Sequence, residues 1–165
     1  MKLLSFKIND KPSFGLLEDK CVIDLSDYFG SKINTLKKAL NLLPFTFDYA
    51  KLQKTKKYKI ENINFLPPII DPAKIICVGV NYESHRIETK RKENIYPTIF
   101  TRFFESQIGH LDNLVVPRKS HRLDYEGELA VIIGMDGKNL STKDSMSIVA
   151  GFSCYNDATV RDWQK

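Results

Sequence analysis

Short apolar runs separated by polar turns predict a chain built mostly of β-strands. Such runs lie at residues 2–8, 14–17, 20–25, 74–79, 123–134 and from 151 onward. Helical spacing, composition or capping predicts helices at residues 34–43, 83–91 and 141–149. Pro44 ends the first of these helices, and Ser141 to Asp144 form a capping pattern at the start of the last. The pattern therefore indicates an α+β fold that is mostly β.

A domain boundary is expected near residues 66–73. Pro67-Pro68 and Asp71-Pro72 push the residues before each proline towards extended backbone, which interrupts regular structure. The boundary divides the 165 residues into a small N-terminal lobe, residues 1–70, and a second domain, residues 71–165. The chain is long enough to bury a substantial core.

Composition and charge exclude several classes of protein. With 42% hydrophobic residues and no apolar run near the ~20 residues that span a bilayer, no membrane association is expected. The N-terminus becomes polar too soon for a signal peptide, so a cytoplasmic location is predicted.

The net charge of +5 is concentrated in residues 1–60, with 12 Lys or Arg against 6 Asp or Glu. Much of it lies in Lys51–Lys59, which lacks the features of a nucleic-acid reader and is expected to be a solvated linker or helix end.

The three cysteines are expected to be reduced core residues. Cys21, Cys77 and Cys154 each lie in an apolar run, and neither their odd number nor their spacing suits a disulfide or metal framework. Cys154 lies close to Asp157, but no histidine follows it. We therefore expect it to be structural rather than a nucleophile.

Two glutamates in an apolar run are the first candidates for chemistry. Glu126 and Glu128 lie two residues apart in the run 123–134, so their carboxylates are expected to face the same way. One interpretation is an ordinary solvated acidic face. The other is a buried pair that requires a cation. Asp157 interrupts the next strand-like run, and three carboxylates from neighbouring strands would suit octahedral Mg²⁺ or Mn²⁺.

A second candidate pair lies in the predicted helix at 83–91. His85 and Glu88 are three residues apart and can share one face of it. A carboxylate beside a histidine raises its basicity and fixes its tautomer, as a general base requires. An ordinary surface ion pair remains the alternative. His110 and His121 lack such a partner and are expected to have surface or loop roles.

Arg102 and Ser106 are candidates for substrate binding. Arg102 lies in an apolar neighbourhood, where a guanidinium requires a carboxylate or an anionic ligand. A structural salt bridge to Asp124 or Asp162 is the alternative, and it is favoured over a substrate carboxylate. Near Ser106 the backbone N–H groups can turn towards a ligand, which is a weak signal by itself.

The second domain resembles the fumarylacetoacetate hydrolase family. The matching segments keep the family's order: Ile75-Ile-Cys-Val-Gly-Val-Asn-Tyr82 with His85 and Glu88, Pro97-Thr-Ile-Phe-Thr-Arg-Phe103, Ser106-Gln-Ile-Gly-His110, Leu123-Asp-Tyr-Glu-Gly-Glu-Leu-Ala-Val-Ile-Ile-Gly134 and Asn156-Asp-Ala-Thr-Val-Arg-Asp-Trp-Gln164. The resemblance implies a mixed β-sandwich or roll domain. Residues 1–70 resemble the family's variable N-terminal lobe only in length and style.

The resemblance also implies a chemistry. Family enzymes bind Mg²⁺ or Mn²⁺ through two glutamates and an aspartate, which correspond to Glu126, Glu128 and Asp157. The family's His/Glu dyad corresponds to His85 and Glu88. Members form homodimers and act on small 2-oxo acids or their enols, as in aromatic catabolism. They hydrolyse acylpyruvates, decarboxylate oxaloacetate, or isomerise and hydrate oxo-dienoates. Hydrolysis of a C–C bond in an acylpyruvate is the predicted reaction.

Family members continue for roughly another hundred residues, within the usual range of domain sizes. The resemblance implies that this portion supplies a substrate-binding lysine, a Gly/Pro-rich active-site segment and much of the sheet. The chain therefore resembles an N-terminal portion of such an enzyme, with an incomplete catalytic domain. The competing hypothesis is a catalytically inactive fragment or interaction module that retains the metal ligands.

Overall fold

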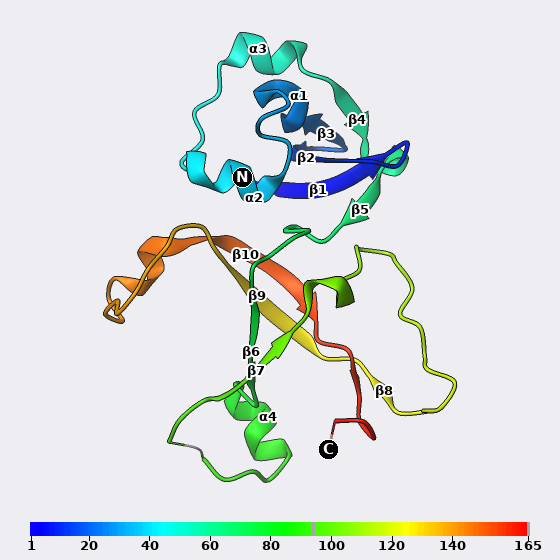
Figure 1. The fold of residues 1–165 in the computed structure, drawn as a ribbon, viewed down its shortest axis with the longest axis vertical. Helices are drawn as coiled ribbons and strands as arrows, with labels where there is room; N and C mark the ends of the chain where they lie inside the picture. Colours follow the sequence, from blue (N-terminus) through cyan, green and yellow to red (C-terminus); the bar gives the residue numbers. More distant parts are fainter. Residues whose placement is uncertain (94, 165) are drawn as a thin grey trace. The chain divides into compact units, whose positions relative to one another are not determined.

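The computed structural model describes residues 1–93 and 95–164 (Figure 1). Its chain divides into two compact units. The first unit contains residues 1–69 and the chain from Ile108 onward, and the second contains Ile70–Gln107. Short strands predominate over short helices, which confirms the predicted mostly-β class. Lys165, the last residue of the predicted second domain, lies outside the described residues. No helix of the described part is both long and apolar enough to cross a membrane.

A five-stranded antiparallel sheet forms the core of the first unit. Its strands follow the order β4-β3-β2-β1-β5. Their bounds are β1 Leu3–Ile8, β2 Lys11–Glu18, β3 Cys21–Asp24, β4 Lys57–Lys59 and β5 Asn64–Leu66. Neighbouring residues Val22 and Ile23 of β3 are fully buried in different clusters, Val22 with Phe6 and Ile23 with Phe14. Because successive side chains of a strand point to opposite faces, this sheet is buried on both faces.

Short helices pack around this sheet. They are α1 Leu25–Phe29, α2 Leu36–Ala39, η1 Leu40–Leu42, α3 Tyr49–Lys54 and η2 Ile60–Asn62. The predicted strand 20–25 ends at Asp24 because its carboxylate caps α1, accepting from the backbone N–H groups of Ser26 and Asp27. The predicted helix 34–43 is an α-turn followed by a 3₁₀ turn. Within Lys51–Lys59, the helix end is confirmed, but Lys57–Lys59 pairs with β3 rather than forming a linker.

The second unit is a β-hairpin with a helix in its connection. Strand β6, Ile75–Gly79, pairs antiparallel with β7, Thr98–Arg102. Helix α4 covers Glu83–Glu88, shorter than the predicted 83–91, and η3 covers Phe104–Ser106. Lys90, just beyond α4, has a positive φ of 52°, so the helix does not extend through it.

Two strand pairs in the last part of the chain carry the acidic candidates. Strand β9, Gly127–Ile133, pairs with β10, Val149–Asn156. Beside them β8, Leu123–Asp124, pairs with β11, Thr159–Val160. The predicted strand 123–134 is thus interrupted at Tyr125-Glu126. Between β9 and β10, the predicted helix 141–149 is replaced by η4, Ser145–Ile148, although the Ser141 hydroxyl does donate to Asp144.

One face of the β9–β10 pair is exposed, which corrects the prediction of a buried strand. Burial alternates along β9, so that every second residue faces solvent. The large apolar side chains on this face are between 49% and 59% exposed: Leu129, Val131, Ile133 and Phe152. The opposite face packs through Ile132 and Ala150 against the core of the five-stranded sheet. Periodicity of two indicated a strand but not that only one face would be covered.

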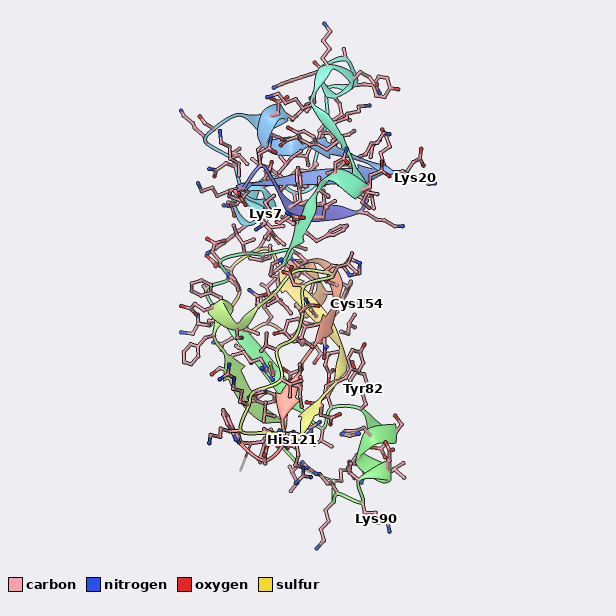
Figure 2. All side chains as sticks on the ribbon, turned by 90° about the vertical axis from the view of Figure 1, so that its right-hand side faces the viewer. Lys7, Lys20, Tyr82, Lys90, His121 and Cys154 are labelled. Atoms are coloured by element: carbon pink, nitrogen blue, oxygen red, sulfur yellow. The ribbon has the colours of Figure 1, made fainter. Side chains whose placement is uncertain are left out.

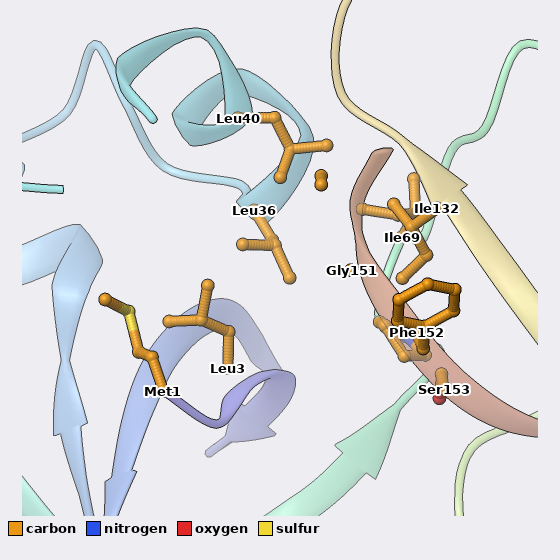
Figure 3. Close-up of a pocket in the computed structure, with 11 residues that line it drawn as sticks. Met1, Leu3, Leu36, Leu40, Ile69, Ile132, Gly151, Phe152 and Ser153 are labelled. Carbon is orange, nitrogen blue, oxygen red and sulfur yellow. The ribbon is translucent and has the colours of Figure 1, made fainter. Parts of the chain in front are cut away.

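A cavity of about 150 Å³ lies where the strand pair meets the N-terminal part of the same unit (Figure 3). Leu3, Leu36 and Leu40 line one side of it. Ile69 and Ile132 line the other side. None of the acidic candidates contributes to its lining.

Candidate functional site

Glu126 and Asp157 lie opposite each other, at the junction of the two strand pairs. Glu126 lies between β8 and β9, and Asp157 lies between β10 and β11. The backbone N–H of Asp157 donates to the carbonyl of Glu126 at 2.8 Å. The backbone N–H of Glu126 donates to the Asn156 side chain at 3.1 Å. Main-chain pairing therefore brings two of the three predicted metal ligands together.

Glu128 belongs to the same neighbourhood. It lies opposite Tyr155 in the β9–β10 ladder and on the half-buried face of β9. Asp157 is buried, with 7% of its surface exposed, and the Glu126 side chain is 22% exposed. A fully solvated acidic face would leave all three residues exposed, so their burial argues against that interpretation.

The Glu126 carboxylate accepts a hydrogen bond at each oxygen. The Thr159 hydroxyl lies 3.0 Å from Oε2. The Arg161 guanidinium lies 2.6 Å from Oε1 and also contacts Asp124 through Nε and Nη2, both at 2.8 Å. These hydrogen bonds, first of all the one to Glu126, raise the pKa of Arg161 above its ordinary value. The candidate site is thus held by an arginine that bridges two carboxylates.

A divalent cation was predicted here, and the donor set agrees with that chemistry. Three carboxylates from neighbouring strand ends are the hard oxygen ligands that Mg²⁺ and Mn²⁺ prefer. The observed arrangement differs. Within residues 1–93 and 95–164, no group of three His, Cys, Asp or Glu side chains is placed to hold a metal ion. Instead, Arg161 supplies the positive charge at Glu126.

His85 and Glu88 lie on α4, in the second unit. The distance from His85 Nδ1 to Glu88 Oε2 is 3.7 Å, with 45% and 81% of the two side chains exposed. This spacing follows from their separation by three residues on one helix. The structure therefore brings the predicted pair together, in a solvated setting where an ordinary ion pair has the same geometry.

Arg102 and Ser106 also lie in the second unit, at its C-terminal end. Arg102 ends β7 opposite Ile75, and its side chain is half-buried. The Ser106 hydroxyl donates to the carbonyl of Phe103 at 2.7 Å. Their roles in substrate binding stay predictions.

The expectation of buried cysteines is wrong for Cys154. It lies on the exposed face of β10, opposite Leu129, whereas Cys21 and Cys77 are half-buried (Figure 2). All three are free thiols, as predicted. Cys154 was placed in the core because its run is apolar, but this side of the strand pair is uncovered.

Sequence reasoning missed Thr159 and Arg161 as parts of the site. Together with Asp157 they follow one another at every second position, a spacing that places side chains on one face of an extended segment. That periodicity was the available signal. Of the two carboxylates considered as partners of Arg102, Asp124 accepts from Arg161 and Asp162 accepts from the Ser120 hydroxyl.

Comparison with known sequences and structures gives a consistent result. The family model described as fumarylacetoacetate (FAA) hydrolase C-terminal matches residues 74–165. A Xenopus laevis protein named oxaloacetate tautomerase fahd2, mitochondrial, is 34% identical across 99% of this chain and 54% of its own length. The chain thus spans about half the length of this curated relative.

Solved structures with the same fold are similarly longer. A fumarylacetoacetate hydrolase from Exiguobacterium antarcticum superposes with a TM-score of 0.78 at 28% identity, over 99% of this chain and 58% of that one. A maleylpyruvate hydrolase from Sphingobium sp. SYK-6, in complex with manganese(II) and pyruvate, gives 0.74 at 22% identity, over 98% and 60%. The second likeness concerns the fold alone.

Proposed function

Because this chain belongs to the fumarylacetoacetate hydrolase family, we propose that it carries cation-binding and proton-transfer residues of an enzyme acting on 2-oxo acids or their enols. The pairing of Glu126 with Asp157 across neighbouring strands, with Glu128 beside them, carries this proposal. The 34% identity to the relative named oxaloacetate tautomerase supports it.

Glu126, Glu128 and Asp157 would hold a Mg²⁺ or Mn²⁺ ion. When bound, such a cation stabilises the negative charge of an enolate formed from a 2-oxo acid. Burial of Asp157 restricts water around this carboxylate and strengthens its electrostatic interactions.

His85 is the proposed general base. Glu88 lies on the Nδ1 side of the ring, so a proton on Nδ1 is favoured and Nε2 is left to accept one. A base of this kind removes a proton next to the keto group, or activates water for hydrolysis of an acylpyruvate. Tautomerisation of oxaloacetate needs a proton removed from carbon and a proton returned to the enolate oxygen, with no attack by water. The 34% identity to a protein of that name favours it as a second candidate reaction.

Turnover by the whole chain tests the function. The kcat/KM for oxaloacetate and for an acylpyruvate is measured in the presence of Mn²⁺. The unaltered protein is compared with the variants Glu126→Gln and Glu128→Gln. Loss of about 3 kcal/mol of charge stabilisation corresponds to a fall in kcat/KM of roughly 100-fold. The matched control is Glu61→Gln, an exposed glutamate in η2. Undiminished turnover in both site variants would exclude the assignment. Retained Mn²⁺ binding without turnover of either substrate would support the inactive-module alternative.

A further inference from the structure

A single guanidinium joins two carboxylates at the candidate site. Arg161 Nη2 lies 2.6 Å from Glu126 Oε1 and 2.8 Å from Asp124 Oδ2, and Nε also donates to Asp124. Its Nη1 donates to Gln164 at 3.2 Å. The Arg161 side chain is 28% exposed and the Glu126 side chain 22%, so water screens their attraction only partly.

The guanidinium is not required for strand pairing. The backbone N–H of Arg161 already donates to the carbonyl of Arg122 at 2.9 Å, next to the pairing of Val160 with Leu123. These hydrogen bonds between main-chain groups hold β8 against β11, and they do not involve the side chain at position 161. The guanidinium contact to Glu126 is therefore additional to the main-chain pairing.

We propose that Arg161 occupies the position at Glu126 that a divalent cation would take, so that the two compete for this carboxylate. The inference rests on the proposed cation-binding function. A guanidinium in contact with a ligand oxygen opposes a second positive charge at that oxygen. Arg161 keeps two bonds to Asp124 when it leaves Glu126, so its displacement leaves no unpaired charge. Arg161 thereby sets the affinity of the site and returns to Glu126 when the cation leaves.

Manganese binding measures this competition without any substrate. The whole chain is titrated with Mn²⁺, and the electron paramagnetic resonance signal of free Mn²⁺ gives the Kd. Arg161→Gln is expected to tighten binding by about tenfold or more, because the opposing charge is gone. Arg161→Lys keeps a charge but cannot bridge both carboxylates, and it should tighten binding less. Arg122→Gln removes the same charge from an exposed side chain, and it should change Kd less than about twofold.

Each result is decisive. Equal or weaker binding by Arg161→Gln overturns the competition, and loss of binding in Glu128→Gln within the same series shows that the proposed cation site nevertheless stands. Absence of Mn²⁺ binding in both the unaltered chain and Arg161→Gln overturns both proposals. Binding by Arg161→Gln alone supports the competition in its strongest form. If circular dichroism shows that Arg161→Gln does not fold, Arg161→Lys decides, and Kd equal to or weaker than that of the unaltered chain overturns the inference.

Discussion

Asp157 and Glu126 are connected through their main chains, by the bond from the Asp157 N–H to the Glu126 carbonyl. The side chains of these residues then take different surroundings, one buried and the other held by Thr159 and Arg161. The spacing of these two residues is therefore set by strand pairing and does not depend on the charge of either carboxylate.

Glu126→Gln should preserve the fold. The main-chain bonds at this position remain, and a partly exposed ion pair contributes about 1 kcal/mol or less. Thermal unfolding should shift Tm by only a few degrees, since ~1 kcal/mol corresponds to about 2–4 °C in a domain of this size. A shift three times larger would show that the ion pair supports the fold.

His85→Asn should lower kcat of the proposed reaction by about 100-fold or more, the usual contribution of a general base. Glu83→Gln on the same helix is the matched control, because Glu83 pairs with Arg86 in solvent rather than with His85. The measurement is kcat against pH for both variants. Equal losses in the two would assign the effect to helix α4 rather than to the imidazole.

Gly15→Ala should destabilise the five-stranded sheet. A Cβ at Gly15 would meet Val22 Cγ1 and lie 2.5 Å from the carbonyl oxygen of Ile23, at a buried position of β2. Such overpacking costs about 2 kcal/mol or more. Gly151→Ala provides the control, because its Cβ would meet nothing within 4 Å and should change stability by about 0.5 kcal/mol at most. Urea unfolding of both variants distinguishes steric overlap from loss of glycine as such.

Asp24→Ala should cost about 2 kcal/mol. Its carboxylate caps α1 and accepts from the buried Ser13 hydroxyl at 2.6 Å, so alanine removes both the cap and this buried hydrogen bond, and Ser26 Oγ at 2.7 Å is the acceptor left to Ser13. Asp24→Asn retains an acceptor oxygen and should restore most of this stability. If both variants unfold alike in urea, the charge rather than the hydrogen bonds stabilises α1.

Asp27 should make stability fall in acid. The backbone N–H and ammonium group of Lys56 hold the pKa of Asp27 below its ordinary value. The folded state therefore favours the ionised form, and this contribution is present above the unfolded pKa of about 3.9 and lost as pH falls through the folded pKa. Unfolding free energies measured from pH 6 to about pH 3 should decline less steeply in Asp27→Asn. Identical slopes would contradict the assigned cause.

The elements that were predictable from sequence are those with strong periodicity or clear capping. The run ending in Ile132 and Ile133 indicated a strand, and the spacing of Glu126 and Glu128 marked a special site on it. The break at Tyr125-Glu126 was not predictable, because only pairing with β10 and β11 shows where one ladder ends and another begins.

Long-range contacts account for what the sequence did not show at the site. Arg161 and Glu126 are distant along the chain, and an arginine in a polar stretch carries no indication of which carboxylate it contacts. The His85–Glu88 pair was accessible because its contact is local to one helix. Cys154 was misplaced because exposure depends on what covers a face, which a residue pattern does not record.

The apolar face of the β9–β10 pair has a consequence for the chain in solution. The exposed face of this two-stranded pair carries a strip of apolar side chains, formed by Leu129, Val131 and Phe152. Exposed apolar surface on strands promotes association between molecules. Light scattering should rise with concentration and with added sulfate, which strengthens apolar association. This strip of apolar side chains is therefore expected to promote association of the protein in solution.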